Sequence, residues 1–298
     1  MNIGFSSYCF RPRMAAGDLS IGDVIRWIGE TGATHIELAS LSLTPRGEDT
    51  VWDLGDHLEV VDEIRTALRE TGVVMSGICI PANFLGAAED RLRQIARTKR
   101  YVDLCDRLGV RFLRHDVTDW GRKPVDIAEV EVSLPVLVDA SAEIADYAAH
   151  VGVTTSIENH GFFINSSERV QRLIHGVGRA NFKTTIDVGN FLCVDEDPLI
   201  ATERNLGLAS FVHLKDFYIR PRNNNPGPGW LETLGRNYLL GSIIGYGDMD
   251  IRGILGALVT TGYDGFVSIE FEGNEDCLFA CATGLANIRR ILSEIRLV

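Results

Sequence analysis

Long apolar runs are absent from this 298-residue sequence, and none approaches the length of a membrane-spanning helix. The first residues, Met1 to Phe5, also lack the basic region and the long apolar core of a secretory signal. Cysteine is scarce, and its spacing shows neither a CxxC pair nor the density of a disulfide-rich secreted protein. The six cysteines are Cys9, Cys79, Cys105, Cys193, Cys277 and Cys281. We therefore expect a cytoplasmic protein without membrane contact, in which the cysteines are buried free thiols.

Positive charge is also in deficit, since 29 Lys and Arg residues face 41 Asp and Glu residues and leave a net charge of −12. Such a surface repels phosphate backbones, so nucleic acid is disfavoured as a substrate or partner. No GxGxxG or GxxxxGK[ST] motif follows the first apolar stretch, so the common phosphate-binding loops of an open doubly wound sheet are missing. Low-complexity runs and Pro/Ser linkers are missing too, which favours one domain over residues 1–298.

The chain instead alternates short apolar stretches with amphipathic segments. Strands are predicted at residues 2–8, 35–38, 73–80, 110–114, 153–158, 183–190, 211–216 and 266–273. Helices are predicted at about 21–31, 56–71, 88–108, 134–150, 167–175, 198–206, 251–261 and 278–295, with Ser20 as N-cap of the first. Glycines suited to helix C-termini follow most of them: Gly32, Gly72, Gly109, Gly152, Gly178 and Gly262. Eight continuous apolar strands, each followed by a helix, predict an α/β fold of the (β/α)8 TIM barrel type.

Polar side chains follow four successive strands of this predicted barrel at the point where each strand ends. They are Glu158, Asp187, His213 and Glu270. Singly, a carboxylate in such a place is usually a helix N-cap or a solvated turn residue. Together, three carboxylates and one imidazole at the same end of a parallel barrel make a hard, oxygen-rich site. Such a site suits Mn²⁺, Mg²⁺ or Co²⁺ more than structural zinc.

A site of this kind suits proton abstraction next to a carbonyl in a small polyhydroxylated compound. A sugar carbon beside a carbonyl is weakly acidic, and a metal chelated by the carbonyl and hydroxyl oxygens would stabilise the resulting enediolate. Glu158 and Glu270 come from different strands, so one could remove the proton and the other return it. Asp187 and His213 would be metal ligands only. An epimerase needs two such acid/base groups, whereas an aldose–ketose isomerase could work with one.

Several motifs in order resemble the xylose-isomerase-like TIM barrel superfamily, over nearly the whole chain. They are Ile157–Gly161 (IENHG), Ile186–Asn190 (IDVGN), Val212–Asp216 (VHLKD), Gly245–Asp248 (GYGD), and Gly262–Gly265 (GYDG) leading to Glu270. The resemblance implies one divalent metal held by Glu158, Asp187, His213 and Glu270, with the two glutamates as acid and base. Mn²⁺ is the first expectation for the metal, with Mg²⁺, Co²⁺ or Zn²⁺ as alternatives. The resemblance also implies a homodimer or homotetramer. The activity it implies is sugar or sugar-phosphate isomerisation or epimerisation, with inosose or 3-dehydroshikimate dehydration as the alternative.

Two other functions fit the sequence less well. A resemblance to endonuclease IV would call for histidine at Asn190 and for Asp-x-His where this chain has Leu239, Leu240 and Gly241. The extra ligands of a three-metal nuclease are therefore absent. A non-catalytic sugar-binding barrel would be favoured if either glutamate were lost, and both are present.

Polar residues near the strand ends are candidate substrate contacts. They are His160, Asn190, His115, Asn83, Lys215, Asp216, Arg220, Arg222 and Trp230. Alternatives stay open for most of them. His160 could orient a carboxylate, His115 and Asn83 could serve turns, and Lys215 and Asp216 could form an ion pair at the rim. Glu37 is expected to pair with Arg114 or another cation, and Glu272 competes with Glu270 for the ligand position.

The connection from Asp216 to Asp250 is much longer than a usual barrel loop. Its Pro- and Gly-rich stretch carries Arg220, Arg222 and Trp230, which predicts either a surface insertion or a lid. As a lid, Trp230 would cover the apolar face of a sugar, and an arginine would meet an anionic group.

Overall fold

The computed structural model describes residues 1–44 and 52–295, and its centre is a closed barrel of eight parallel strands. Around the barrel the strands are β1 (Asn2–Ser6), β2 (His35–Ala39), β3 (Val74–Ile80), β4 (Phe112–His115), β5 (Thr154–Glu158), β6 (Phe182–Asp187), β7 (Ala209–Leu214) and β11 (Phe266–Ile269). The barrel closes where β1 pairs in parallel with β11. This confirms the predicted (β/α)8 fold.

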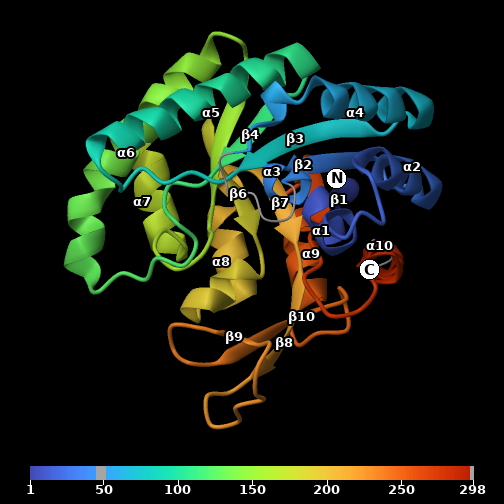
Figure 1. The fold of residues 1–298 in the computed structure, drawn as a ribbon. Helices are drawn as coiled ribbons and strands as arrows, with labels where there is room; N and C mark the ends of the chain where they lie inside the picture. Colours follow the sequence, from blue (N-terminus) through green and yellow to red (C-terminus); the bar gives the residue numbers. More distant parts are fainter. Residues whose placement is uncertain (45–51, 296–298) are drawn as a thin grey trace.

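Long helices surround the barrel and cover the outward faces of the strands (Figure 1). The helices are α1 (Arg11–Ala15), α2 (Ile21–Thr31), α3 (Ser40–Leu43), α4 (Leu58–Thr71), α5 (Ala88–Leu108), α6 (Ile127–Ala149), α7 (Ser167–Val177), α8 (Pro198–Asn205), α9 (Ile251–Thr260) and α10 (Cys277–Ile295). The short α1 and α3 lie in the connections after β1 and β2. Short 3-10 turns lie at η1 (Ser7–Phe10), η2 (Leu54–Asp56), η3 (Asn190–Val194) and η4 (Leu206–Leu208). Helix α2 begins as predicted, with a reciprocal capping box between Ser20 and Asp23.

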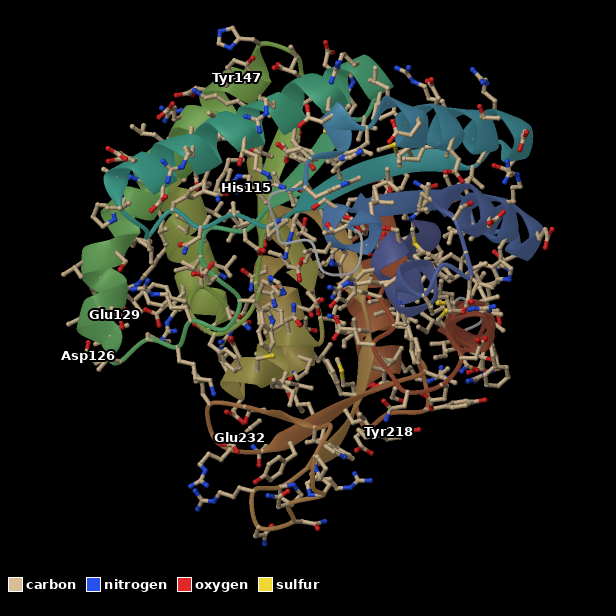
Figure 2. All side chains as sticks on the ribbon, in the orientation of Figure 1. His115, Asp126, Glu129, Tyr147, Tyr218 and Glu232 are labelled. Carbon is tan, nitrogen blue, oxygen red and sulfur yellow. The ribbon has the colours of Figure 1, made fainter. Side chains whose placement is uncertain are left out.

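Helix α6 is longer than the sequence pattern predicts, because it begins at Ile127 and not near residue 134. The Asp126 side chain accepts a hydrogen bond from the backbone N–H of Glu129, and the Glu129 carboxylate accepts one from the backbone N–H of Val125. Both labelled side chains lie at the start of the helix in Figure 2. Pro135 lies inside the helix at an exposed position. The local cap therefore extends the helix through a residue that usually interrupts one.

Aromatic rings fill the interior of the barrel at the amino-terminal ends of its strands. Phe112 and Phe266 are the first residues of β4 and β11, and both rings pack against the ring of Phe211, with centroid distances of 6.2 and 5.8 Å. The His35 ring also packs on Phe266, and Gly4 makes room for it, since a Cβ on Gly4 would lie 2.6 Å from that ring. The aromatic rings close the amino-terminal end of the barrel. The polar groups lie at the opposite end, at the carboxyl ends of the strands, where the barrel is open.

The long connection after β7 forms a small antiparallel sheet of β8 (Asp216–Arg220), β9 (Leu231–Glu232) and β10 (Tyr238–Ser242). It extends below the barrel in Figure 1. The six cysteines are buried and free. No helix in the described parts of the chain is long and apolar enough to cross a membrane.

Candidate metal centre and active-site cavity

Four side chains from the carboxyl ends of neighbouring strands converge inside the barrel. Glu158 and Asp187 are the last residues of β5 and β6, His213 is next to last in β7, and Glu270 follows β11. Each is buried and offers one donor atom, and these atoms all lie within 4.8 Å of one another. The structure thus brings together the four residues that the sequence singles out.

The imidazole of His213 lies between the carboxylates. Its Nδ1 is 3.4 Å from Glu158 Oε2, 3.7 Å from Glu270 Oε2 and 4.0 Å from Asp187 Oδ2. His213 Nδ1 is buried without a hydrogen-bond partner among the described residues, and the close polar contact of Asp187 Oδ2 is the Lys215 ammonium at 2.9 Å. Buried polar atoms left in this way are costly unless another group satisfies them. Three carboxylates and one imidazole are ligands that Mn²⁺, Mg²⁺ or Co²⁺ accept, so the donor set fits a divalent ion.

The far side of the His213 ring is fixed by Glu37. His213 Nε2 lies 2.7 Å from Glu37 Oε2, and Cys79 Sγ donates to the other oxygen of Glu37 at 2.9 Å. The imidazole therefore turns Nδ1 toward the carboxylates. A carboxylate behind a histidine ligand commonly orients the ring and raises its basicity. The sequence predicts Arg114 or another cation as the partner of Glu37, and the structure places the imidazole of His213 there instead.

The carboxylates of Asp187 and Glu158 are held by neighbouring groups. Asp187 Oδ1 accepts backbone N–H groups from Gly189 and Asn190, both at 2.9 Å, which leaves Oδ2 for the site. Asn159 brackets the backbone of Asp187 with two hydrogen bonds of 2.8 Å. Glu158 Oε1 accepts from the Asn190 side chain at 2.8 Å. Asn190, predicted as a substrate contact, is therefore placed to orient Glu158.

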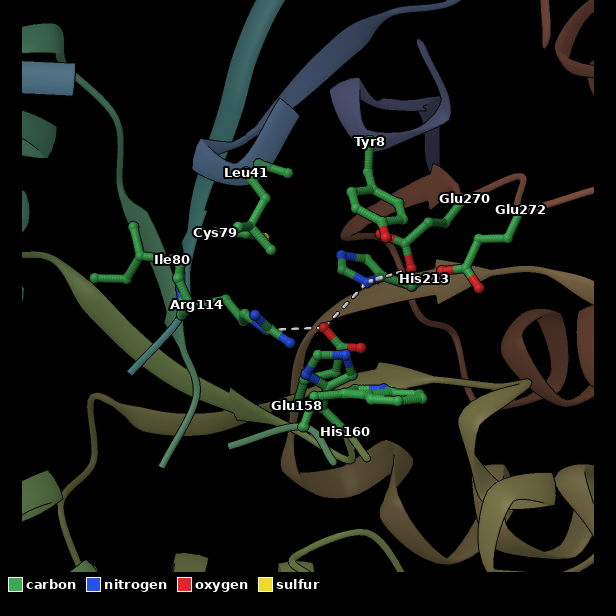
Figure 3. A pocket seen from close by; sticks show the side chains of 13 residues that line it. Tyr8, Leu41, Cys79, Ile80, Arg114, Glu158, His160, His213, Glu270 and Glu272 are labelled. Carbon is green, nitrogen blue, oxygen red and sulfur yellow. Dashed lines mark ion pairs between the residues drawn. The ribbon is translucent and has the colours of Figure 1, made fainter. Parts of the chain in front are cut away.

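Two buried cations balance the negative charge of the site. Lys215 Nζ lies 2.9 Å from both Asp187 Oδ2 and Glu270 Oε2, and 3.1 Å from Glu272 Oε1. On the other side, Arg114 Nε lies 2.8 Å from Glu158 Oε2 (Figure 3). Without these cations, the desolvated carboxylates would repel one another strongly.

The cations also decide which carboxylates are ionised. Burial opposes ionisation of Glu158, but Arg114 and His213 hold its pKa well below the usual range. Burial likewise opposes ionisation of Glu270, but Lys215 and His213 lower its pKa to about 2. For Asp187, burial outweighs the attraction of Lys215 and raises the pKa to about 7. Both glutamates are therefore carboxylates at neutral pH, as a ligand or a proton acceptor must be.

A cavity of about 330 Å³ opens above these groups (Figure 3). Its walls are Tyr8, Ala39, Leu41, Cys79, Ile80, Pro81, Arg114, Trp120, Glu158, His160, His213, Glu270 and Glu272. Glu270 belongs to the group of four donors, whereas the half-exposed Glu272 lines the cavity and pairs with Lys215. One wall is apolar and the opposite wall is charged, which is usual in pockets for small polar organic molecules.

His160 is the predicted substrate contact that lines this cavity. Its Nδ1 lies 2.9 Å from Asp116 Oδ1, and Asp116 is in turn paired with Arg114 at 2.9 Å. Burial lowers the pKa of His160, but the Asp116 carboxylate outweighs burial and raises it above the ordinary value. Asp116 thus fixes the His160 ring at Nδ1, and the ring lines the cavity.

His115 and Asn83 are not among the residues that line the cavity. Arg114 points inward, so its neighbour His115 points outward and packs against Phe84. Burial lowers the pKa of His115 to about 4, so the ring is neutral. Asn83 accepts the backbone N–H of Leu85, as a turn residue does. Asn83 thus matches the turn alternative left open by the sequence, whereas His115 packs behind the strand, a position that neither of the sequence-based alternatives predicts.

Asp216 has a structural role in place of the predicted substrate contact. It is buried and accepts backbone N–H groups of Phe217, Gly245, Gly247 and Met249. Gly247 is required there, since an added Cβ would lie 2.2 Å from the Asp216 carboxylate. Asp216 therefore ties the start of the small sheet to its end.

Arg220, Arg222 and Trp230 do not line the cavity either. The Arg220 guanidinium lies 5.5 Å from the centre of the Trp230 ring and 3.3 Å from Asp248. Arg222 is exposed, and its backbone N–H binds Asn237. In this structure the segment is a surface sheet, as in the insertion alternative, and not a cover over the barrel mouth.

Other cavity residues had no signal in the sequence. Tyr8 lies in η1, just beyond the first strand, and Trp120 lies in the loop after β4. Tyr8 ends the predicted first strand but belongs to none of the motifs, and Trp120 belongs to neither a predicted element nor a motif. Arg114 could have been recognised as a buried cation at a strand end, but its partners come from β5 and the loop after β4.

Comparisons with known proteins agree with this fold. A family model described as xylose isomerase-like TIM barrel matches residues 25–291. An inosose dehydratase from Geobacillus thermodenitrificans (strain NG80-2) is 27% identical over 154 residues, which are 51% of this chain and only 50% of that protein.

Two solved structures illustrate the likeness in fold. The apo form of the 3-keto-D-glucoside 4-epimerase YcjR from E. coli superposes with a TM-score of 0.70 at 17% identity, over 97% of this chain and 99% of that chain. A xylose isomerase-like TIM barrel protein from Mycobacterium smegmatis, in complex with magnesium, gives 0.68 at 19% identity, over 92% and 88%. At these identities the likeness establishes the fold alone.

Proposed function

The chain belongs to the xylose isomerase-like TIM barrel family, and from that membership and the site we propose a divalent-metal-dependent sugar isomerase or epimerase. The observation that carries the proposal is the group of Glu158, Asp187, His213 and Glu270 in the wall of a small polar cavity. We propose Mn²⁺ as the ion, with Mg²⁺ and Co²⁺ as substitutes that the same ligands accept. The substrate would be a small polyhydroxylated carbonyl compound.

These four side chains would hold the ion, which when bound would act as a Lewis acid toward the substrate carbonyl. Lys215 keeps Asp187 and Glu270 close without mutual repulsion, and Glu37 holds the His213 ring. Apolar side chains of Leu41 and Ile80 exclude water from one side of the cavity. The reacting carbon would therefore be bound in a fixed position beside the carboxylates.

Glu158 and Glu270 are the proposed proton-transfer groups. They come from β5 and from the end of β11, on either side of His213 Nδ1. One carboxylate oxygen would accept the proton from the carbon next to the carbonyl, and the other glutamate would return a proton from the opposite side. Two glutamates so placed would invert the configuration, which is epimerisation.

A dehydratase is the second candidate, because of His160. Its ring faces the cavity and is held by Asp116, so in its protonated form it can transfer a proton to a hydroxyl group on the neighbouring carbon, which then leaves as water. The same first proton abstraction would then end in loss of water. The similarity to an inosose dehydratase supports this candidate, although the match covers half of each chain.

A substrate panel distinguishes the two reactions. The Mn²⁺-loaded protein would be incubated in D₂O with ketoses, inososes and 3-dehydroshikimate, and the products read by NMR after removal of the metal. New sugar signals with deuterium beside the carbonyl are expected for epimerisation or isomerisation, and a new vinyl proton for dehydration. If no member of the panel exchanges a proton or loses water, the proposal is wrong for these compound classes.

Glu37 provides a test that needs no substrate. Glu37→Gln keeps the size of this buried side chain but removes the charge behind His213, so we expect metal affinity to fall by about 10- to 100-fold. Competition with a fluorescent metal indicator measures the affinity. Glu203→Gln, on the exposed face of α8, is the matched control and should bind the metal as the parent does. An unchanged affinity in Glu37→Gln would show that the carboxylate does not support His213 as a ligand.

A further inference from the structure

A second cavity, of about 600 Å³, adjoins the one that contains the donor group. It lies between residues 8–13 and the loop of residues 271–277 that joins β11 to α10. Tyr8 and Glu272 line both cavities, so these two side chains form the boundary between them. We call them the inner cavity, with the donor group, and the outer cavity, which is nearly twice as large.

The inner cavity is small for a site that would hold a whole multi-ring compound. Its volume of about 330 Å³ is at the low end of the range of about 300–1,000 Å³ found for ligand pockets. A single polyhydroxylated ring fits this volume. A substrate with a second ring would extend past Tyr8 and Glu272 into the outer cavity.

The boundary between the cavities suits a sugar. In Figure 3 the Tyr8 ring stands beside Glu270 and Glu272. A phenol keeps its proton at neutral pH. Tyr8 thus offers an apolar ring face and a hydrogen-bond donor together, and a sugar presents the matching C–H face and hydroxyl groups.

The charges of the outer cavity select a neutral ligand. Arg11 and Arg13 face three carboxylates, those of Glu272, Glu275 and Asp276. Arg13 is paired with Asp276 at 3.6 Å, and Arg11 lies over the Tyr8 ring with no ion pair to a carboxylate of the described residues. Glu272 is in turn paired with Lys215 at 3.1 Å, so Arg11 and Glu275 remain for a ligand, and their opposite charges leave no net positive charge to attract a phosphate or carboxylate. Hydroxyl groups of a sugar can accept hydrogen bonds from Arg11 and Asn274 and can donate one to Glu275.

We propose that the outer cavity binds a second, neutral sugar unit, and hence that the substrate is a glycosylated carbonyl sugar and not a free monosaccharide or a sugar phosphate. The carbonyl-bearing unit occupies the inner cavity, and the other unit lies between Tyr8 and the loop of residues 271–277. This inference rests on the proposed function for the identity of the reacting unit. Its own evidence is the shape and charge of the outer cavity.

Ligand-observed saturation-transfer NMR with the Mg²⁺-loaded protein tests the inference without turnover. The probes are D-fructose and four glucosyl-fructoses that differ in linkage: turanose, maltulose, leucrose and isomaltulose. At least one disaccharide is expected to bind about tenfold more tightly than D-fructose, with saturation on both sugar units. If none of the four does so, or if saturation stays on the fructose unit, the outer cavity is not a sugar site.

Variants of the outer cavity add a second readout. The double variant Arg11→Ala/Asn274→Ala is expected to weaken the favoured disaccharide by about tenfold more than D-fructose, and to remove saturation from the glucosyl unit. Arg26→Ala, an exposed arginine of α2 paired with Glu70, is the control and should match the parent. Equal affinities in the double variant and the parent would overturn the proposal.

Deuterium exchange from D₂O, measured with the same sugars and the Mn²⁺-loaded protein, separates the two proposals. Saturation of the glucosyl unit without exchange beside the carbonyl would support the outer cavity and contradict the proposed function. Deuterium exchange with D-fructose, without saturation of the glucosyl unit in any disaccharide, would support the proposed function and contradict the outer cavity as a sugar site.

Discussion

Glu158→Gln and Glu270→Gln are each expected to slow exchange between solvent and the substrate proton beside the carbonyl by on the order of 10² or more. The amide keeps the size of the side chain but cannot accept the proton. Both carboxylates are ionised in the structure, since Arg114 and Lys215 lower the pKa of Glu158 and Glu270 against the effect of burial. Exchange into D₂O, followed by NMR on a substrate identified in the panel, measures the loss.

Each glutamate is also a proposed metal ligand, so metal content must be measured on the same samples. Exchange rates are compared at saturating metal, which removes any effect of weaker binding. Glu203→Gln serves as the control for the substitution itself. If both site variants retained exchange at saturating metal, the two glutamates would have no part in proton transfer.

Removal of the metal is expected to abolish activity, and Mn²⁺ or Co²⁺ is expected to restore it. The reason is the donor group itself, in which the buried His213 Nδ1 has no hydrogen-bond partner in the described chain and three carboxylates lie around it. The purified protein should contain about one divalent ion per chain, measured by elemental analysis before and after dialysis against a chelator. Full activity after exhaustive chelation would contradict metal dependence.

The barrel could be predicted because its signals are local and repeated. Continuous apolar strands followed by amphipathic helices indicate a parallel barrel, and helix ends such as the Ser20 cap and Gly32 follow from short-range chemistry. The convergence of Glu158 and Asp187 also follows, because the strands of a parallel barrel all end on one side. Only the roles of these residues stay predictions.

The rest of the site depends on contacts that no local pattern contains. Which residue of β4 faces inward is set by strand register, so Arg114 enters the cavity and His115 does not. Glu37 reaches His213 across the barrel, between residues 176 positions apart. In the sequence, Asp216 resembles a site residue because it is a carboxylate at a strand end. In the structure, its carboxylate accepts hydrogen bonds from the backbone N–H groups of Gly245 and Gly247, which lie in a turn distant in sequence.

Anomalous diffraction from crystals grown with Mn²⁺ tests the central claim most directly, because it locates the ion without reference to activity. The account predicts one strong peak in the barrel, bounded by Glu158, Asp187, His213 and Glu270, and its loss in crystals of Asp187→Asn grown in the same way. A barrel without such a peak, or a peak that persists unchanged in the variant, would contradict the assignment of these four residues as the metal site.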